Sequence, residues 1–256
     1  GVLGTAKDGD ISDAGTLVTD NPQAGKIVDA GTYVITLNMI DYTYSVVRAD
    51  SYYMVGGVYG WNAEAASKLA FYNEGGSKAS ITTQWTGDAN LKIWNRANIN
   101  NWDLAWGSVT DGETAAEGDL VNSGANAFVC PEKGAYYTLT IDMSSKKDSW
   151  KKLDNQEPQA FSHVSIIGGF NDWKADVDMT QTAPHNWYLR HKFTAATEMK
   201  FRADHEWTTS WGGQTAALAD MIYCAAAGGD NLNIPAGTYD IYFNDITGQF
   251  MFVAVN

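Results

Sequence analysis

The chain has 256 residues, 45% of them hydrophobic and 18% charged, and its formal net charge is −13. This charge removes the electrostatic attraction on which binding to nucleic acid or to an anionic bilayer depends, so we expect neither as a partner. The 10 Trp, 13 Tyr and 9 Phe residues suit contact with a neutral, polar, ring-shaped ligand. An equally weighted alternative is that the acidity only keeps the protein in solution.

Short motifs recur along the chain, and such repeats fix the number of units. A Gly-x-Tyr strand start occurs at Gly31, Gly134 and Gly237, 103 residues apart at each step. The motif that ends at Trp61 recurs at Trp173, and the motif Trp102 to Gly107 recurs as Trp207 to Gly212. We therefore predict a partial N-terminal β module over residues 1–50, made of terminal strands only, and two complete modules over residues 51–150 and 160–256.

Strands are predicted along the whole chain. Residues 1–50 hold only the end of a module, because no Gly-Gly-x-x-x-Trp motif precedes Gly31, so this piece either packs on its neighbour or is completed by other strands. In the second unit we predict strands at 52–55, 68–72, 80–86, 91–94, 127–130, 136–143 and 146–150, with a helical turn at 63–66. A polar linker covers 151–160, and strands follow at 163–168, 177–181, 186–193, 198–203, 232–234, 238–243 and 249–255. About seven short strands per module predict an all-β fold of tandem, immunoglobulin-like β-sandwiches.

The two cysteines and the hydropathy bear on the compartment. Cys130 and Cys224 occupy positions that do not correspond in the repeat, so we predict two buried free thiols, with one bridge between modules as the alternative. No run of 18 apolar residues and no leader occurs, so we expect no membrane span and expect any signal or lipid anchor to lie outside this sequence.

Strand alternation assigns some aromatic residues to the core. Trp187 and Phe193 share one face of their strand, opposite charged residues, so both are predicted to point inward. Phe193 precedes Met199 by six residues, as Trp85 precedes Leu91, which predicts that Trp85 is also in the core. The tyrosine of each Gly-x-Tyr start recurs in all three copies, which favours packing.

The following strand displays the opposite pattern. Lys200 and Arg202 are predicted to face outward in the last unit, and Lys92 and Trp94 in the one before it, with Arg96 just beyond. An ordinary solvated strand face followed by a polar loop also explains each copy. Two copies favour a function.

Four more tryptophans flank these strands. Trp61 and Trp173 follow small or polar loop residues, from which a large ring can be held at the surface. We assign Trp106 and Trp211 to the surface and place Trp102 and Trp207 in the core, with the reverse assignment left open. Exposed indole rings beside Lys, Arg or Asn donors are what a sugar requires, because its apolar face stacks on the ring and its hydroxyls accept hydrogen bonds.

Taken in order, these motifs resemble one known family. Residues 164–173, Asn186-Trp187-Tyr188, Met199-Lys200-Phe201-Arg202, Trp211-Gly212-Gly213 and 231–239 together look like a module of the SusE/SusF outer-membrane starch-binding proteins of Bacteroidetes. The similarity is strongest over 160–256, moderate over 51–150, and limited to residues 26–33 in the first unit.

The resemblance implies a lipid-anchored cell-surface protein without catalytic activity or cofactor, which holds α-glucan chains by stacking and by Arg or Lys hydrogen bonds. Other outer-membrane glycan-uptake proteins would be its partners. Carried over by position, one site comprises Trp173, Lys200, Arg202 and Trp211. The other comprises Trp61, Lys92, Trp94, Arg96 and Trp106, and Trp94 departs from the pattern because it stands where the last module has Arg202.

Two other functional classes remain. A glycoside hydrolase needs a pair of carboxylates across a cleft, but Asp172 and Asp204 correspond to Gly60 and Arg96, so no acidic pair recurs. The four histidines, His163, His185, His191 and His205, lack metal-ligand spacing, so no metal site is predicted. A structural or adhesive sandwich protein would explain the fold, but not the repeated indole rings.

Overall fold

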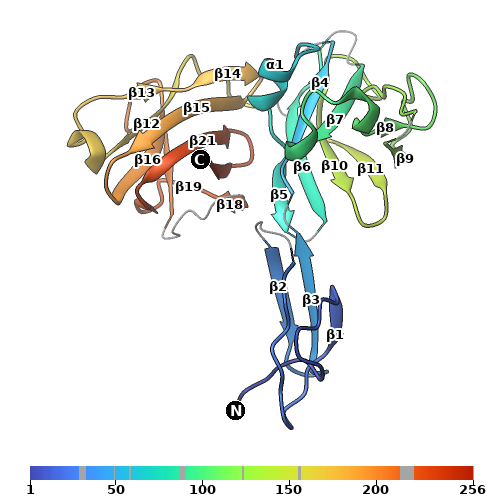
Figure 1. Cartoon of the computed structure of the whole chain (residues 1–256). Coiled ribbons are helices and arrows are strands. Elements are labelled where there is room, and N and C mark those ends of the chain that lie inside the picture. The colour runs from blue at the N-terminus through green and yellow to red at the C-terminus, as the bar shows by residue number, and fades with distance from the viewer. Residues whose placement is uncertain are drawn as a thin grey trace.

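The computed structural model describes residues 1–28, 33–48, 50–57, 59–75, 77–86, 90–122, 124–154, 157–213 and 222–255. Within these ranges the chain is built almost entirely of antiparallel strands (Figure 1). The all-β prediction is confirmed. The division at residues 50 and 160 stays a prediction; each sheet lies within one predicted unit, apart from two residues at the end of one strand. We use "middle module" for residues 51–150 and "last module" for residues 160–256.

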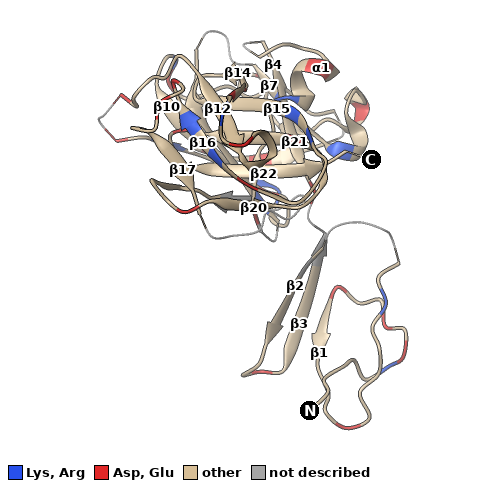
Figure 2. Ribbon diagram, turned by 90° about the vertical axis from the view of Figure 1, so that its left-hand side faces the viewer, with Lys and Arg blue, Asp and Glu red and all other residues tan. Residues whose placement is uncertain are grey.

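The N-terminal unit is a three-stranded sheet in the order β1-β3-β2. Its strands are β1 (Ala14–Thr16), β2 (Tyr33–Asn38) and β3 (Thr43–Arg48). The sheet projects away from the rest of the molecule in both views (Figure 1 and Figure 2). Ile35 and Leu37 are exposed on β2 and line an open apolar hollow together with Tyr44. The repeat position Gly31 lies outside the described residues.

The middle module packs a two-stranded sheet, β4-β7, against a six-stranded sheet in the order β5-β6-β10-β11-β9-β8. The two sheets enclose a core that includes Met54, Phe71, Trp85 and Leu139. The elements are β4 (Tyr52–Gly56), α1 (Ala63–Ser67), β5 (Tyr72–Gly75), β6 (Lys78–Gln84), β7 (Leu91–Asn95), η1 (Arg96–Asn98), η2 (Trp102–Leu104), β8 (Gly107–Ser108), β9 (Glu117–Val121), β10 (Tyr136–Asp142) and β11 (Lys147–Lys152).

The last module repeats this plan with a six-stranded and a five-stranded sheet. One has the order β13-β12-β16-β17-β19, with β20 also on β16, and the other β14-β15-β21-β22-β18. Between them, the rings of Phe201 and Phe243 stack with their centroids 4.3 Å apart. The elements are β12 (Val164–Gly168), η3 (Gly169–Asn171), β13 (Val177–Asp178), β14 (Thr180–Ala183), β15 (Asn186–Phe193), β16 (Thr197–Ala203), β17 (Ser210–Gly212), β18 (Ile222–Cys224), β19 (Ala226–Ala227), β20 (Leu232–Ile234), β21 (Gly237–Asn244) and β22 (Gln249–Ala254).

The core assignments from strand alternation are confirmed for Trp85, Trp187 and Phe193, which are all buried. The assignment of both thiols to the interior is half right, because Cys130 is buried whereas Cys224 is exposed; both are free. Among the described residues, no helix combines the length and the apolar character that crossing a membrane requires.

The middle and last modules share a buried apolar contact, which we call the joint. Tyr53, Val55 and Trp94, on the outer face of β4 and β7, pack with Tyr242 and Met251 of β21 and β22. The hydroxyl of Tyr242 also donates a hydrogen bond of 2.6 Å to the carbonyl oxygen of Ser67 in the middle module. A sheet face that would be solvated in a single module is therefore a core surface in the pair.

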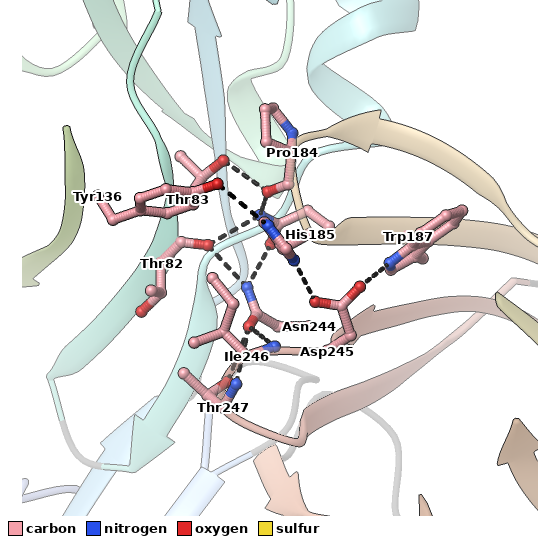
Figure 3. Close-up of polar contacts among 11 residues, drawn as sticks. Thr82, Thr83, Tyr136, Pro184, His185, Trp187, Asn244, Asp245, Ile246 and Thr247 are labelled. Carbon is pink, nitrogen blue, oxygen red and sulfur yellow. Dashed lines mark hydrogen bonds and ion pairs between the residues drawn. The ribbon is translucent and has the colours of Figure 1, made fainter. Parts of the chain in front are cut away.

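Polar groups extend the joint (Figure 3). The carbonyl oxygen of Thr82 accepts from Nδ2 of Asn186, at 2.9 Å, and from Nδ2 of Asn244, at 2.7 Å. Oγ1 of Thr83 donates to the carbonyl oxygen of Pro184 at 2.7 Å. Because Asn186 and Asn244 are buried, these bonds fix the register of one module on the other and would be costly to leave unmade.

Candidate functional site

Each complete module displays a pair of tilted indole rings. In the middle module the ring centroids of Trp61 and Trp102 are 6.1 Å apart with an interplanar angle of 38°, and the two side chains are 44% and 42% exposed. In the last module the rings of Trp173 and Trp207 are also 6.1 Å apart, at 42°. Trp207 is 51% exposed and Trp173 is half-buried. We call Trp61 and Trp102 the middle pair, and Trp173 and Trp207 the last pair.

The first ring of each pair is held by an unusual backbone. Gly60, just before Trp61, has φ +96°, and a Cβ there would lie 2.9 Å from Cβ of Ala65. Asp172 and Trp173 follow η3 with φ +56° and +59°, a conformation that is rare for side chains of this size. Such strain persists only where the surroundings impose it, and it concentrates at functional sites.

Hydrogen bonds impose this conformation on Trp173. Its N–H donates to the carbonyl oxygen of Gly168 at 2.9 Å, and the N–H of Asp172 donates to that of Gly169 at 3.3 Å. The side chain of Asn171 accepts from the N–H of Gly168 at 3.3 Å and donates to the carbonyl oxygen of Ala175. The loop after β12 is thus built to hold one indole ring at the surface.

The second ring of each pair rests on a different support. Trp102, in η2, stands edge-on to Trp94 with centroids 4.5 Å apart, and Nε1 of Trp94 donates to the carbonyl oxygen of Asn101. Trp207 lies in the turn after β16, where the guanidinium carbon of Arg202 is 4.7 Å from its ring centroid. Trp94 and Arg202 thus occupy equivalent positions in the two modules. Each packs against the second ring of its pair, Trp102 or Trp207, which we call the outer ring.

The charge of Arg202 is neutralised where it lies. Its Nε donates to Oδ1 of Asp176 at 2.7 Å and its Nη2 donates to Oδ2, and Oγ of Ser165 donates to the same carboxylate at 2.5 Å. The hydrogen bond from Arg202 lowers the pKa of Asp176 below its ordinary value. The guanidinium of Arg202 is therefore a buried cation, paired with Asp176, beneath the ring of Trp207.

Two predicted surface rings, those of Trp94 and Trp211, are buried and a third, that of Trp106, is half-buried, which corrects the prediction from the sequence. Trp94 is 0% exposed because the joint covers its strand face, and Trp211 is 7% exposed because it lies on β17 among core aromatics. Trp106 is half-buried and packs against the core of the middle module. Conversely, Trp102 and Trp207, assigned to the core, are exposed, so the reverse assignment that the sequence left open is correct.

Close backbone contacts explain why Trp106 and Trp211 are drawn inward. A Cβ added at Gly107 would lie 2.1 Å from the carbonyl oxygen of Asn126, and one at Gly212 would lie 2.0 Å from that of Asp230. The glycine in each Trp-Gly step therefore serves tight strand packing, which puts the preceding indole into the sheet. The first tryptophan of each motif precedes this packed segment and is left outside it.

The remaining predicted cations lie on, or directly after, the strands that carry Arg202 and Trp94. Lys200 is half-buried on β16, on the same outer face as Arg202, and lines an open polar hollow of about 560 Å³ with Glu198, Asp230 and Asn231. In the middle module, Lys92 is half-buried on β7 opposite Val55 of the joint. Arg96 is exposed and donates from Nη2 to the carbonyl oxygen of Ala254, 2.7 Å away in the last module.

Carboxylates near the last pair hold the loops together. Oδ1 of Asp204 accepts from the N–H groups of Ser162 and His163, at 2.8 and 2.9 Å. Asp172 pairs with Lys174 at 3.1 Å. Asp176 is bound to Arg202. Asp172, Asp176 and Asp204 therefore each have a partner within the module.

Comparison with known proteins adds to this geometry. The family model described as "SusF, first starch specific CBM" matches residues 1–48 and again residues 46–149, more than half of the chain in all. Outer membrane protein SusF of Bacteroides thetaiotaomicron is 24% identical over 226 residues, which is 83% of this chain and 46% of that protein. The chain thus spans about half the length of this relative.

The crystal structure of SusF from Bacteroides thetaiotaomicron aligns with 94% of this chain and 56% of that chain, at 17% identity and a TM-score of 0.37. So loose a superposition carries no argument about the site. The family match rests on sequence, and it covers the partial N-terminal unit as well as the whole middle module. The chain therefore belongs to the SusE/SusF family, through its match to the starch-specific carbohydrate-binding module of SusF.

Proposed function

We propose that this chain is a non-catalytic polysaccharide-binding protein that holds an α-glucan such as starch on its two tryptophan pairs. The observation that carries the proposal is the recurrence of the pair itself. Two modules with different supports beneath the outer ring keep the same 6.1 Å separation and nearly the same tilt, 38° and 42°. Core packing does not require that Trp61, Trp102 and Trp207 be 42–51% exposed, so the repeated arrangement favours a ligand.

The tilt favours a curved ligand. Successive sugar rings of a helical α-glucan are turned relative to each other, so two indole faces at about 40° can each stack on a different ring. A flat, extended glucan would instead suit coplanar rings. We therefore infer that α-linked glucans bind in preference to cellulose-like chains.

Hydrogen bonds from nearby cations would add orientation. Lys200 shares the outer face of β16 with Arg202, and Lys92 shares that of β7 with Trp94, so each amine lies on the strand that supports an outer ring. We assign these amines, with the exposed Arg96, to sugar hydroxyls. Arg202 is given a positioning role, because Asp176 and Trp207 engage its guanidinium.

Each pair alone should bind weakly, with Kd of about 0.1 to 1 mM, because two stacked rings and a few exposed hydrogen bonds give a net of only about −4 to −5.5 kcal/mol. Engaging both modules on one polymer raises the apparent affinity by roughly 10² to 10⁴. By the name of its relative, we also propose an outer-membrane location, lipid-anchored at the cell surface alongside other glycan-uptake proteins.

Affinity electrophoresis of the full chain tests this proposal. Amylose, pullulan, a β-glucan and an unrelated polysaccharide are cast into the gels. We expect retardation by the α-glucans, reduced in Trp102→Ala and in Trp207→Ala and lost in the double variant. Leu104→Ala is a matched control, because Leu104 is an exposed apolar residue of η2 outside the ring pair.

Retardation by no polysaccharide would favour the structural or adhesive alternative. Release of reducing ends from any of them would favour the hydrolase. Equal retardation of the double variant would show that binding takes place elsewhere on the chain.

A further inference from the structure

Two histidines and an aspartate meet on the last module, outside the tryptophan pairs. His163 precedes β12, Asp178 ends β13, and His205 lies in the turn after β16. Their ligand atoms all lie within 4.8 Å of one another. These ligands come from three separate segments and leave no spacing motif in the sequence, from which no metal site is predicted; the pairing of the strands brings them together.

The backbone holds the two histidines in register. The carboxylate of Asp204 accepts the N–H groups of Ser162 and His163, and the N–H of Asp204 donates to the carbonyl oxygen of His163 at 2.9 Å. Asp204 and His205 both have positive φ, +49° and +60°, which turns the chain back over the start of β12. The imidazole rings then stack with centroids 4.9 Å apart and 28° between planes.

The aspartate is placed independently of this turn. Asp178 pairs with Ser165 across β12 and β13, so its position is fixed by the sheet. Its Oδ1 lies 2.6 Å from Nε2 of His205. This His–Asp contact is exposed, with side chains 41% and 51% accessible, so little packing opposes a small rotation of either group.

We propose that His163, Asp178 and His205 bind one divalent transition-metal ion, with Zn²⁺ as the best match. Two imidazole nitrogens and a carboxylate oxygen are a ligand set that Zn²⁺ uses with water in the fourth position. Ca²⁺ and Mg²⁺ prefer oxygen ligands, so they fit this set poorly. Since Zn–N and Zn–O distances are about 2.0 to 2.2 Å, tetrahedral ligand atoms stand about 3.3 to 3.6 Å apart. Any ligand atoms as far as 4.8 Å apart must therefore approach each other, whereas Nε2 of His205 and Oδ1 of Asp178, now 2.6 Å apart, must separate, and the exposed side chains allow both movements.

The ion would tie β13 to the turn that carries Trp207. His205 is two residues before Trp207, and Asp178 is two residues after Asp176, which holds Arg202 beneath that ring. A bound metal would therefore restrain the outer ring of the last pair. This consequence, unlike the metal site itself, rests on the proposed function. The residue that precedes β4 in the middle module is Ser51, so the same set is not repeated there.

The site is tested by calorimetric titration of the EDTA-treated and dialysed full chain with ZnCl₂. We expect saturation at one equivalent and a rise in Tm with zinc. His163→Ala and His205→Ala should each weaken binding at least tenfold. His191→Ala and Asp172→Asn are matched controls, since they remove a histidine and an exposed aspartate of the same module outside the cluster, and both should bind as the parent does.

Folding of each variant is checked by circular dichroism in EDTA. Co²⁺ gives a second readout, because tetrahedral nitrogen and oxygen coordination produces visible absorption that His205→Ala should abolish. Absence of saturable zinc binding, or unchanged affinity in both His163→Ala and His205→Ala, would overturn the proposal. Neither measurement uses a polysaccharide, so its result is separate from the test of the proposed function.

Discussion

The ring of Trp102 stands edge-on to that of Trp94, with 4.5 Å between centroids and 62° between planes. One ring is exposed and the other is entirely buried in the joint between modules. The ring of Trp102 in the middle pair is thus supported by the contact between the modules, whereas in the last pair the ring of Trp207 is supported by Arg202, which is paired with Asp176.

This relationship predicts that replacing Trp94 mainly lowers stability, whereas replacing Trp102 mainly weakens ligand binding. Trp94→Ala should lower the free energy of unfolding by about 3 to 5 kcal/mol, because it leaves a large cavity in the joint. Trp102→Ala should cost less than this, about 1 kcal/mol, since its side chain is 42% exposed, yet should weaken α-glucan binding. Urea unfolding and gel retardation measure the two effects. Similar stability losses in both variants would contradict this assignment.

The pair formed by Arg202 and Asp176 gives a second prediction. Arg202→Met should destabilise the last module by about 3 kcal/mol, because it leaves a mostly buried carboxylate without its base. The double variant Arg202→Met/Asp176→Asn should recover part of this loss, since the unpaired charge is gone. Thermal unfolding of both variants provides the measurement, and a double variant less stable than Arg202→Met would argue against the explanation.

Acid should weaken the same pair. Because the pKa of Asp176 is lowered in the folded state, its contribution to stability is complete above the ordinary carboxyl pKa and is lost as the pH falls below it. Stability of the parent should therefore fall more steeply below about pH 4 than that of Asp176→Asn. Urea midpoints between pH 2.5 and 6 would detect the difference, and parallel pH profiles would refute it.

The raised pKa of Asp148 predicts that stability changes with pH in the opposite direction. Burial, with a smaller effect from Glu113, raises its pKa to about 6, so the folded state holds the proton more tightly than the unfolded state. Its stabilising contribution is full below about pH 4 and is lost as the pH rises through about 6. Asp148→Asn, which is uncharged, should gain about 2 kcal/mol relative to the parent at pH 7 and nearly nothing at pH 4. Equal effects at both pH values would contradict the prediction.

The joint should make the middle and last modules unfold together. Met251 is fully buried in the joint, and its neighbours Phe250 and Phe252 face the core of the last module instead. Met251→Arg should therefore separate one calorimetric transition into two and leave the last module folded. Lys192→Ala is the control, because Lys192 is exposed on the same sheet. A single transition in Met251→Arg would mean that the modules couple by another route.

Sequence alternation succeeds where a side chain's surroundings are set within one module. Trp187 follows the two-residue period of β15, and Trp85, which was predicted from its six-residue spacing to Leu91, lies just after β6; both are buried as predicted. Alternation also identified the outer face of β7, but it could not reveal that another module covers that face, so Trp94 was assigned to solvent. The contact that buries Trp94 comes from residues around 242–253, and no local pattern encodes it.

The tryptophan pairs were only half visible in the sequence. Trp61 and Trp173 were assigned to surface loops, and their ring partners were assigned to the core. The glycine that follows Trp106 and Trp211 was the signal that these two rings lie inside. It allows close backbone contact between neighbouring segments, and does not mark a flexible loop that exposes the ring. The histidine cluster depends on which strands pair, and it became visible only with β12, β13 and β16 assembled.

The double hydrogen bond to the carbonyl oxygen of Thr82, within a packed apolar contact, also has a consequence for ligand size. Contacts between side chains of the two modules, rather than a flexible linker, fix the distance between the middle pair and the last pair. An oligosaccharide shorter than that distance can occupy one pair only, whatever its concentration. On the proposed function, affinity should then increase in a single step at the chain length that first bridges both pairs, so that the fixed joint would make binding depend on polymer length as well as on the type of sugar.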